Sequence, residues 1–145
     1  MNNYFKFLLI CFLSIVLSKS IYSQTEDEWV APKSADNLIN PLAGLQPTEA
    51  AQQLYVSNCL PCHGDKGKGD GPIGASLDPR PYNLTKKKVD NETDGSVFWR
   101  ITNGHKSMPT FKNTLDPMQR WQIVTYIRSL QQQAETEAKA KQKKK

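Results

Sequence analysis

The feature that most constrains this 145-residue chain is the run Cys59-Leu60-Pro61-Cys62-His63. The third cysteine, Cys11, lies in an apolar run close to the N-terminus. If that run is removed on export, Cys59 and Cys62 are the only cysteines left, and they are then in an oxidising compartment where lone thiols do not persist unused. The pair must therefore take part in a bond or hold a cofactor.

The N-terminus has the pattern of an address for export. Residues 7–17 form an apolar run of 11 residues, preceded by Lys6 and followed by small polar residues. A transmembrane helix needs about 17 to 25 apolar residues, so the run is too short to span a bilayer. We therefore predict a secretory signal peptide over residues 1–23 and a periplasmic protein, with an uncleaved N-terminal anchor as the alternative.

The positive charge lies outside the central part of the chain. The sequence has 19 basic and 14 acidic residues, yet residues 24–130 contain 12 of each. Residues 131–145 contain five lysines and two glutamates. A nucleic-acid-binding domain needs a basic face on its folded part, so this distribution argues against nucleic acid as the partner. The basic tail can contact an anionic surface.

Hydrophobic periodicity predicts an all-α domain of three to four helices. A helix is expected after Thr48, running into the cysteine motif, and a short one over residues 96–103, capped by Asp94. The last one begins at the pair Asp116-Pro117 and keeps its apolar period to Leu130. Residues 24–46 are expected to form an extended lead-in, and residues 131–145 a frayed helical extension or a disordered tail. The long loop rich in Gly and Pro between helices indicates that a bound group fills the core.

The C-x-x-C-H pattern predicts covalent attachment of one haem c. Two thiols three residues apart reach the two vinyl groups of a porphyrin, while the adjacent imidazole of His63 binds the iron. A redox dithiol would require a thioredoxin-like sheet, which the sequence does not predict. A zinc site needs four ligands, and a structural disulfide across two residues would stabilise little. Neither a zinc site nor a disulfide fits the pattern as well as haem attachment does.

The second axial ligand is expected to be Met108. The other candidates are His105 and Met118, and Met118 falls in the first turn of the last helix, at the surface or the edge of the core. Met108 precedes Pro109 in a loop, where irregular backbone lets the thioether point inward. His63 and Met108 would occupy both axial positions and raise the reduction potential. The chemistry left to such an iron is one-electron transfer.

These motifs resemble class I c-type cytochromes, over about residues 47–130. The resemblance implies a small cytochrome c fold, with loops wrapped around one covalently bound haem. It also implies a crossing of the first and last helices through Ala51, Tyr55 and Tyr126, and a hydrogen bond from the ligand imidazole to the carbonyl of Pro72. Several candidates to hold the haem propionates lie in matching stretches: Arg80, Tyr82, Asn83, Trp99 and Arg100. Trp99 and Trp121 are also expected to pack in the core, since both lie in apolar-periodic helices.

The expected function is that of a periplasmic electron carrier, not an enzyme. It would act as a soluble shuttle or as the haem subunit of a respiratory complex, and its partners would be redox proteins or complex subunits. Membrane association is expected through such a complex or through the basic tail. The alternative is a haem enzyme or sensor with Met108 displaceable. Four lysines flank the motif and ligand loops and are expected to steer an acidic partner: Lys66, Lys68, Lys106 and Lys112.

Overall fold

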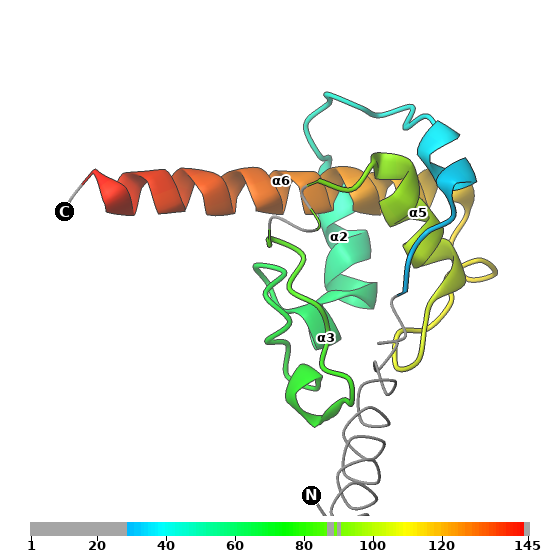
Figure 1. Ribbon diagram of the computed structural model, residues 1–145, viewed down its shortest axis with the longest axis horizontal. Helices are drawn as coiled ribbons and strands as arrows, with labels where there is room; N and C mark the ends of the chain where they lie inside the picture. The colour runs from blue at the N-terminus through cyan, green and yellow to red at the C-terminus, as the bar shows by residue number, and fades with distance from the viewer. Residues whose placement is uncertain (1–28, 87–88, 90, 144–145) are drawn as a thin grey trace, which may run out of the picture. The chain divides into compact units, whose positions relative to one another are not determined.

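The computed structural model describes residues 29–86, 89 and 91–143, so the predicted signal peptide lies outside the described residues. The chain divides into two compact units, Met1–Val30 and Ala31–Lys145, and the second contains every element below. In order these are η1 (Lys33–Asn37), α2 (Glu49–Asn58), α3 (Leu60–His63), η2 (Gly74–Ser76), α5 (Asp94–Asn103) and α6 (Pro117–Gln142) (Figure 1). Extended pairing within the described ranges is confined to one bridge between His105 and Met108. The all-α prediction is confirmed.

The helices begin at residues whose side chains satisfy the first free backbone N–H groups. Thr48 Oγ1 accepts a hydrogen bond from the Ala51 N–H at the start of α2. Asp116 and Gln119 form a reciprocal capping box, with Pro117 in the first turn of α6. The cap of α5 is Thr93, whose hydroxyl accepts from the Ser96 N–H, whereas the sequence predicted Asp94. Asp94 is free to make other contacts because the helix begins one residue earlier.

The centre of the fold is the crossing of α2 and α6. Ala51 and Tyr55 are buried on α2, with relative exposures of 2% and 0%. The rings of Tyr55 and Tyr126 meet across the crossing with centroids 5.0 Å apart. The Tyr55 hydroxyl donates a 2.8 Å hydrogen bond to the carbonyl of Gly64. The crossing therefore holds the chain just beyond the C-x-x-C-H motif.

Helix α5 packs on the first half of α6 through aromatic rings. Phe98 stacks on Trp121 with centroids 4.0 Å apart, and the Arg120 guanidinium lies 4.9 Å from the centre of the Phe98 ring. Trp121 belongs to the buried core, as the sequence predicted. Trp99 is half-buried and lies outside that core, which corrects the prediction made for it.

Residues 31–47 are fastened to the helical core. Asp36 Oδ1 accepts hydrogen bonds from Thr93 Oγ1 at 2.7 Å and from Ser96 Oγ at 2.9 Å. These two hydrogen bonds lower the pKa of the Asp36 carboxyl. Gly95 lets η1 approach α5, because a Cβ at Gly95 would overlap the Ala35 carbonyl. The lead-in is therefore part of the folded unit.

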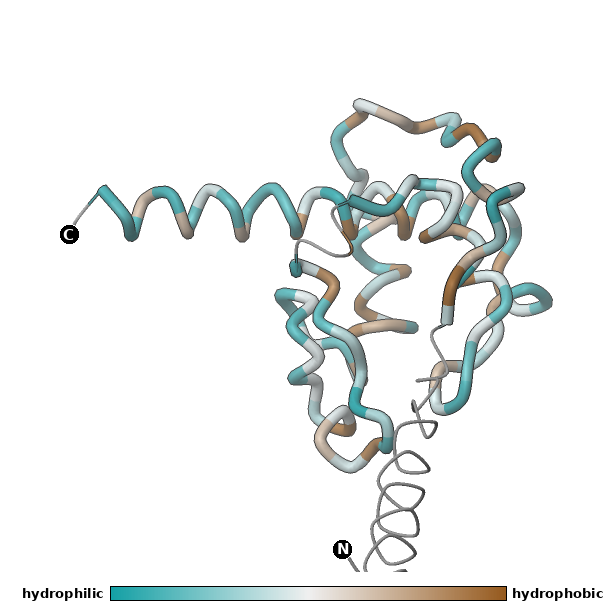
Figure 2. Tube along the Cα trace, in the orientation of Figure 1, coloured by the Kyte–Doolittle hydropathy of each residue, from teal (hydrophilic) through white to brown (hydrophobic). Residues whose placement is uncertain are grey.

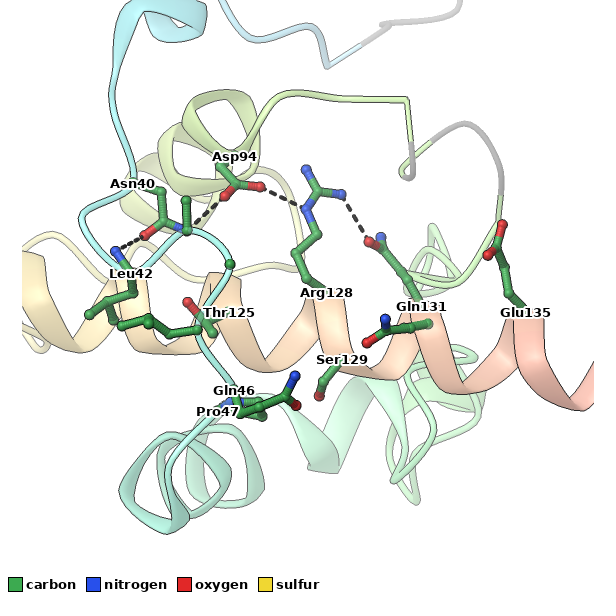
Figure 3. Close-up of a pocket in the computed structure, with 14 residues that line it drawn as sticks. Asn40, Leu42, Gln46, Pro47, Asp94, Thr125, Arg128, Ser129, Gln131 and Glu135 are labelled. Atoms are coloured by element: carbon green, nitrogen blue, oxygen red, sulfur yellow. Dashed lines mark hydrogen bonds and ion pairs between the residues drawn. The ribbon is translucent and has the colours of Figure 1, made fainter.

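A polar network fixes the rest of this lead-in (Figure 3). Asn40 Nδ2 donates to Asp94 Oδ2 at 2.7 Å, and Arg128 Nε donates to Asp94 Oδ1 at the same distance. Arg128 Nη1 also donates to Gln131 Oε1 at 2.9 Å. One carboxylate thus joins the lead-in, α5 and α6.

Helix α6 continues well beyond the core. It remains helical to Gln142, which selects the helical extension among the two predicted conformations of the tail. Figure 1 shows this end extending away from the other elements of the second unit, and Figure 2 shows that it is hydrophilic. Among the described residues, no helix is both long and apolar enough to cross a membrane.

Tyr55→Phe should destabilise the protein by about 1–3 kcal/mol, because the buried Gly64 carbonyl loses its hydrogen-bond donor. Urea unfolding of the haem-loaded protein measures this change. Tyr126→Phe is the matched control, since it alters the other ring of the same crossing. Equal losses in the two variants would show that the Tyr55 hydroxyl has no special role.

Gly95→Ala should loosen the lead-in, because the new methyl group overlaps the Ala35 carbonyl. We expect a loss of about 1–3 kcal/mol, as for other overpacked contacts. Hydrogen exchange should show reduced protection in η1, while protection in α2 is retained. Unchanged protection of η1 would contradict the described packing.

Candidate functional site

Cys59, Cys62 and His63 lie on a single helical turn. Cys59 is both the last cap of α2 and the first cap of α3. The N–H groups of Cys62 and His63 both donate to the Cys59 carbonyl, at 3.2 and 2.8 Å. Residues three and four apart share one face of a helix, so two sulfur atoms and one imidazole are presented together. This is the arrangement that attachment of a haem requires.

The environment of the two thiols fits thioether bonds better than redox chemistry. Both cysteines are unbridged, Cys59 in the buried core and Cys62 half-buried. Burial, and to a smaller extent Cys62, raises the pKa of the Cys59 thiol to about 12. A reactive dithiol needs a lowered pKa, because the thiolate is the nucleophile. A thioether carries no charge, so it incurs no such desolvation cost in this site.

The His63 imidazole is oriented by a backbone carbonyl. Its Nδ1 lies 3.1 Å from the carbonyl oxygen of Tyr82. A carbonyl only accepts, so Nδ1 carries the proton and Nε2 keeps the lone pair that a metal would bind. Burial lowers the pKa of His63, and the hydrogen bond to Tyr82 partly offsets this, so the neutral form is favoured.

The acceptor at His63 differs from the one implied by the resemblance. The structure places Tyr82 at Nδ1, whereas the sequence analysis named the carbonyl of Pro72. The reason lies in the loop contacts, because Leu84 N–H donates to the Gly67 carbonyl at 2.7 Å and holds this segment against the glycine-rich loop. The contribution of Tyr82 comes from its backbone, which no side-chain motif could have indicated.

The glycine-rich loop wraps the end of α3. The N–H groups of Gly69, Gly71 and Ile73 donate to the carbonyls of His63, Cys62 and Pro61, at 2.8, 3.2 and 3.0 Å. These bonds satisfy carbonyls that a helix end leaves without partners. A Cβ at Gly71 would overlap the backbone of α3, so glycine is required at that position. The loop therefore fixes the turn that carries the motif.

Met108 lies in a short, well-anchored turn. Its N–H and carbonyl exchange 2.9 Å hydrogen bonds with His105, and Ser107 Oγ donates to the Asp78 carbonyl at 3.2 Å. The Met108 side chain is partly buried and packs against the hydrophobic core that contains Cys59. Met118, in contrast, is 48% exposed. The sequence analysis did not identify Ser107 as an anchor of this turn.

Two of the candidates to hold the haem propionates form hydrogen bonds to other residues. Arg100 forms two 2.9 Å hydrogen bonds with the Glu92 carboxylate, through Nε and Nη2. Asn83 Oδ1 accepts from the N–H and the hydroxyl of Thr85. Arg80 and Tyr82 remain exposed candidates for contact with haem propionates.

Of the predicted steering lysines, Lys66 pairs with Glu137 of α6 at 3.2 Å, so one carboxylate partly neutralises it. Lys68, Lys106 and Lys112 are exposed. Lys106 occupies the Met108 turn with a positive φ of 51°.

The structure does not support the zinc alternative. Within the part of the chain that the structure describes, no three His, Cys, Asp or Glu side chains are grouped so that they could hold a metal ion. His105 and His63 therefore do not join the cysteines in a tetrahedral set.

Comparison with known proteins agrees with this geometry. Residues 46–127 match the family described as cytochrome c oxidase, cbb3-type, subunit III. The cbb3-type cytochrome c oxidase subunit FixP of Bradyrhizobium sp. (strain ORS 278) is 31% identical over 101 residues, which cover 65% of this chain and 33% of FixP. The FixP of Bradyrhizobium diazoefficiens is 33% identical, with the same coverage. The chain thus spans about a third of the length of these relatives.

The chain is also similar to two proteins other than FixP. Cytochrome c6 of Limnospira maxima is 29% identical over 80 residues, covering 54% of this chain and 86% of that protein. Among solved structures, the reducing HAO-like protein complex Kustc0457/Kustc0458 of Kuenenia stuttgartiensis contains a chain with a TM-score of 0.52 and 29% identity. The match covers 64% of this chain and 49% of that one. The chain therefore belongs to the cbb3-type subunit III family of class I c-type cytochromes, and its cofactor is covalently attached haem c.

Proposed function

We propose that the protein is a periplasmic one-electron carrier in which His63 and Met108 are the axial ligands of the haem iron. The proposal rests on the position of Met108, which packs against the core that contains Cys59. Cys59 itself lies one helical turn before His63. When bound, the haem supplies a one-electron couple. Cys59 and Cys62 would hold it through thioether bonds, and His63 Nε2 and the Met108 sulfur would bind its iron.

Protein ligands on both sides of the iron would limit the chemistry to electron transfer. Met108 is held by its bridge to His105, and the chain beyond it by the 2.7 Å hydrogen bond from Thr110 Oγ1 to the Thr102 carbonyl. Such anchoring would keep the Met108 thioether in place in both redox states of the haem, so that little would reorganise when the electron moves. The same anchoring favours carriage over the alternative in which Met108 is displaced by a substrate or a gas.

We further propose that the protein works as a subunit of a respiratory complex. Two relatives are named as subunits of a cbb3-type cytochrome c oxidase, and the structural neighbour belongs to a protein complex. The lead-in of residues 31–47 and the extension of α6 add surface that an unattached carrier does not need. Size-exclusion of gently solubilised membranes tests this, because a haem signal at the size of the free chain alone would contradict it.

Met108→Ala should remove the weak far-red absorption of sulfur-to-iron ligation in the oxidised protein. It should also lower the reduction potential, since Met/His ligation raises it. Carbon monoxide should then bind the reduced variant, because one axial position is open. Optical titration and carbon monoxide difference spectra measure these effects.

Met118→Ala is the control, because its side chain is exposed in the first turn of α6. It should keep the absorption and the potential of the wild type. If the far-red absorption persists in Met108→Ala, another thioether is the ligand, and loss of the absorption in Met118→Ala would then identify Met118. If the absorption is already absent from the wild type, the ligand is not a thioether, and His105→Ala tests His105.

A further inference from the structure

The proposed electron transfer makes no use of the outer end of α6, residues 131–143, which we call the arm. Beyond Gln131 nearly every residue of the arm is exposed. The sequence contains no large apolar residue after Leu130, and Figure 2 shows the arm as mostly hydrophilic. A helix that is polar all round is not held by packing in a core. Packing in the core therefore does not explain why this helix continues to Gln142.

Charge along the arm is separated into two parts. Both acidic residues, Glu135 and Glu137, lie in its inner half. From Lys139 to the end of the sequence there are five lysines and no acidic residue. Lysines at the C-terminal end of a helix also suit the negative end of its dipole. The sequence from Lys139 onward therefore carries positive charge only.

Ion pairs hold the inner half and leave the outer charge in excess. Glu137 pairs with Lys66, in the loop that follows the haem-attachment motif, at 3.2 Å. Glu135 pairs with Lys139 at 3.6 Å. Glu137 is shared between Lys66 of the folded core and Lys141 of the arm, so it offsets the charge of the arm lysines only in part. The direction of the arm follows from the continuous helix α6, and this exposed pair adds one contact to the haem-attachment loop.

We propose that the arm binds the anionic phospholipid headgroups of a membrane surface. A lysine close to an anionic bilayer strengthens binding by about fivefold, which corresponds to about 1 kcal/mol. Lys139, Lys141 and Lys143 together should therefore contribute about 100-fold. Since α6 is one continuous helix, this attachment would hold the whole second unit beside the membrane.

The composition of the arm favours lipid over a protein partner. Protein interfaces are centred on aromatic and Arg anchors and are poor in lysine. The arm contains only Gln, Ala, Glu, Thr and Lys, so it offers no side chain that could fill a pocket. A dense anionic surface requires nothing but concentrated positive charge.

The test uses the exported haem-loaded full chain and two sets of vesicles, one of phosphatidylcholine alone and one with phosphatidylglycerol added. The measured quantity is the ratio of binding to anionic over neutral vesicles, by co-sedimentation. Replacing Lys139, Lys141 and Lys143 by Gln should reduce this ratio about 100-fold. The ratio for the wild type should also fall steeply above about 0.1 M salt, where screening becomes short-ranged.

A matched control removes the same charge elsewhere, through Lys33→Gln, Lys86→Gln and Lys112→Gln. It should keep most of the wild-type ratio. All variants share the N-terminal segment, so an uncleaved anchor would cancel in the comparison, and the readout is independent of electron transfer. Equal ratios for the arm variant and the wild type would overturn the proposal. So would arm-dependent binding to solubilised membrane proteins without binding to lipid, which would assign the arm to a protein partner.

Discussion

The structure depends on the crossing of α2 and α6, because this contact fixes the one turn that carries the chemistry. Tyr55 is fully buried in the crossing and donates a hydrogen bond to the Gly64 carbonyl, directly after His63. From the other side, the glycine-rich loop bonds to the carbonyls of α3. Two sulfur atoms and an imidazole are therefore held in place on a turn that is too short to be stable by itself.

Much of this fold could be predicted from the sequence, since its helices carry strong local signals. The pair Asp116-Pro117 and the apolar period up to Leu130 both mark α6, and the structure adds a capping box with Gln119. The C-x-x-C-H spacing predicted the haem, because that spacing follows from helix geometry and the porphyrin edge. The position of Met108 in a loop led to its choice over Met118 as the expected ligand, and the structure shows that Met118 is exposed. The ligand role of Met108 stays a prediction.

Other features could not be predicted, because they arise from contacts between residues that are far apart in the sequence. The acceptor at His63 is the carbonyl of Tyr82, which any residue at that position would supply. Docking of the lead-in depends on the hydroxyls of Thr93 and Ser96, which are separated from Asp36 by more than fifty residues. The helical state of the arm could not be predicted, because its sequence lacks an apolar face. In the structure, Glu137 of the arm pairs with Lys66 of the core.

The most direct test of the account is the mass and colour of the exported protein from cells able to attach haem. We predict a mass that exceeds the polypeptide by one haem, and a visible spectrum that survives denaturation. Cys59→Ser together with Cys62→Ser should abolish both properties. A colourless wild-type protein with the mass of its amino acids alone, made in the same cells, would contradict the account.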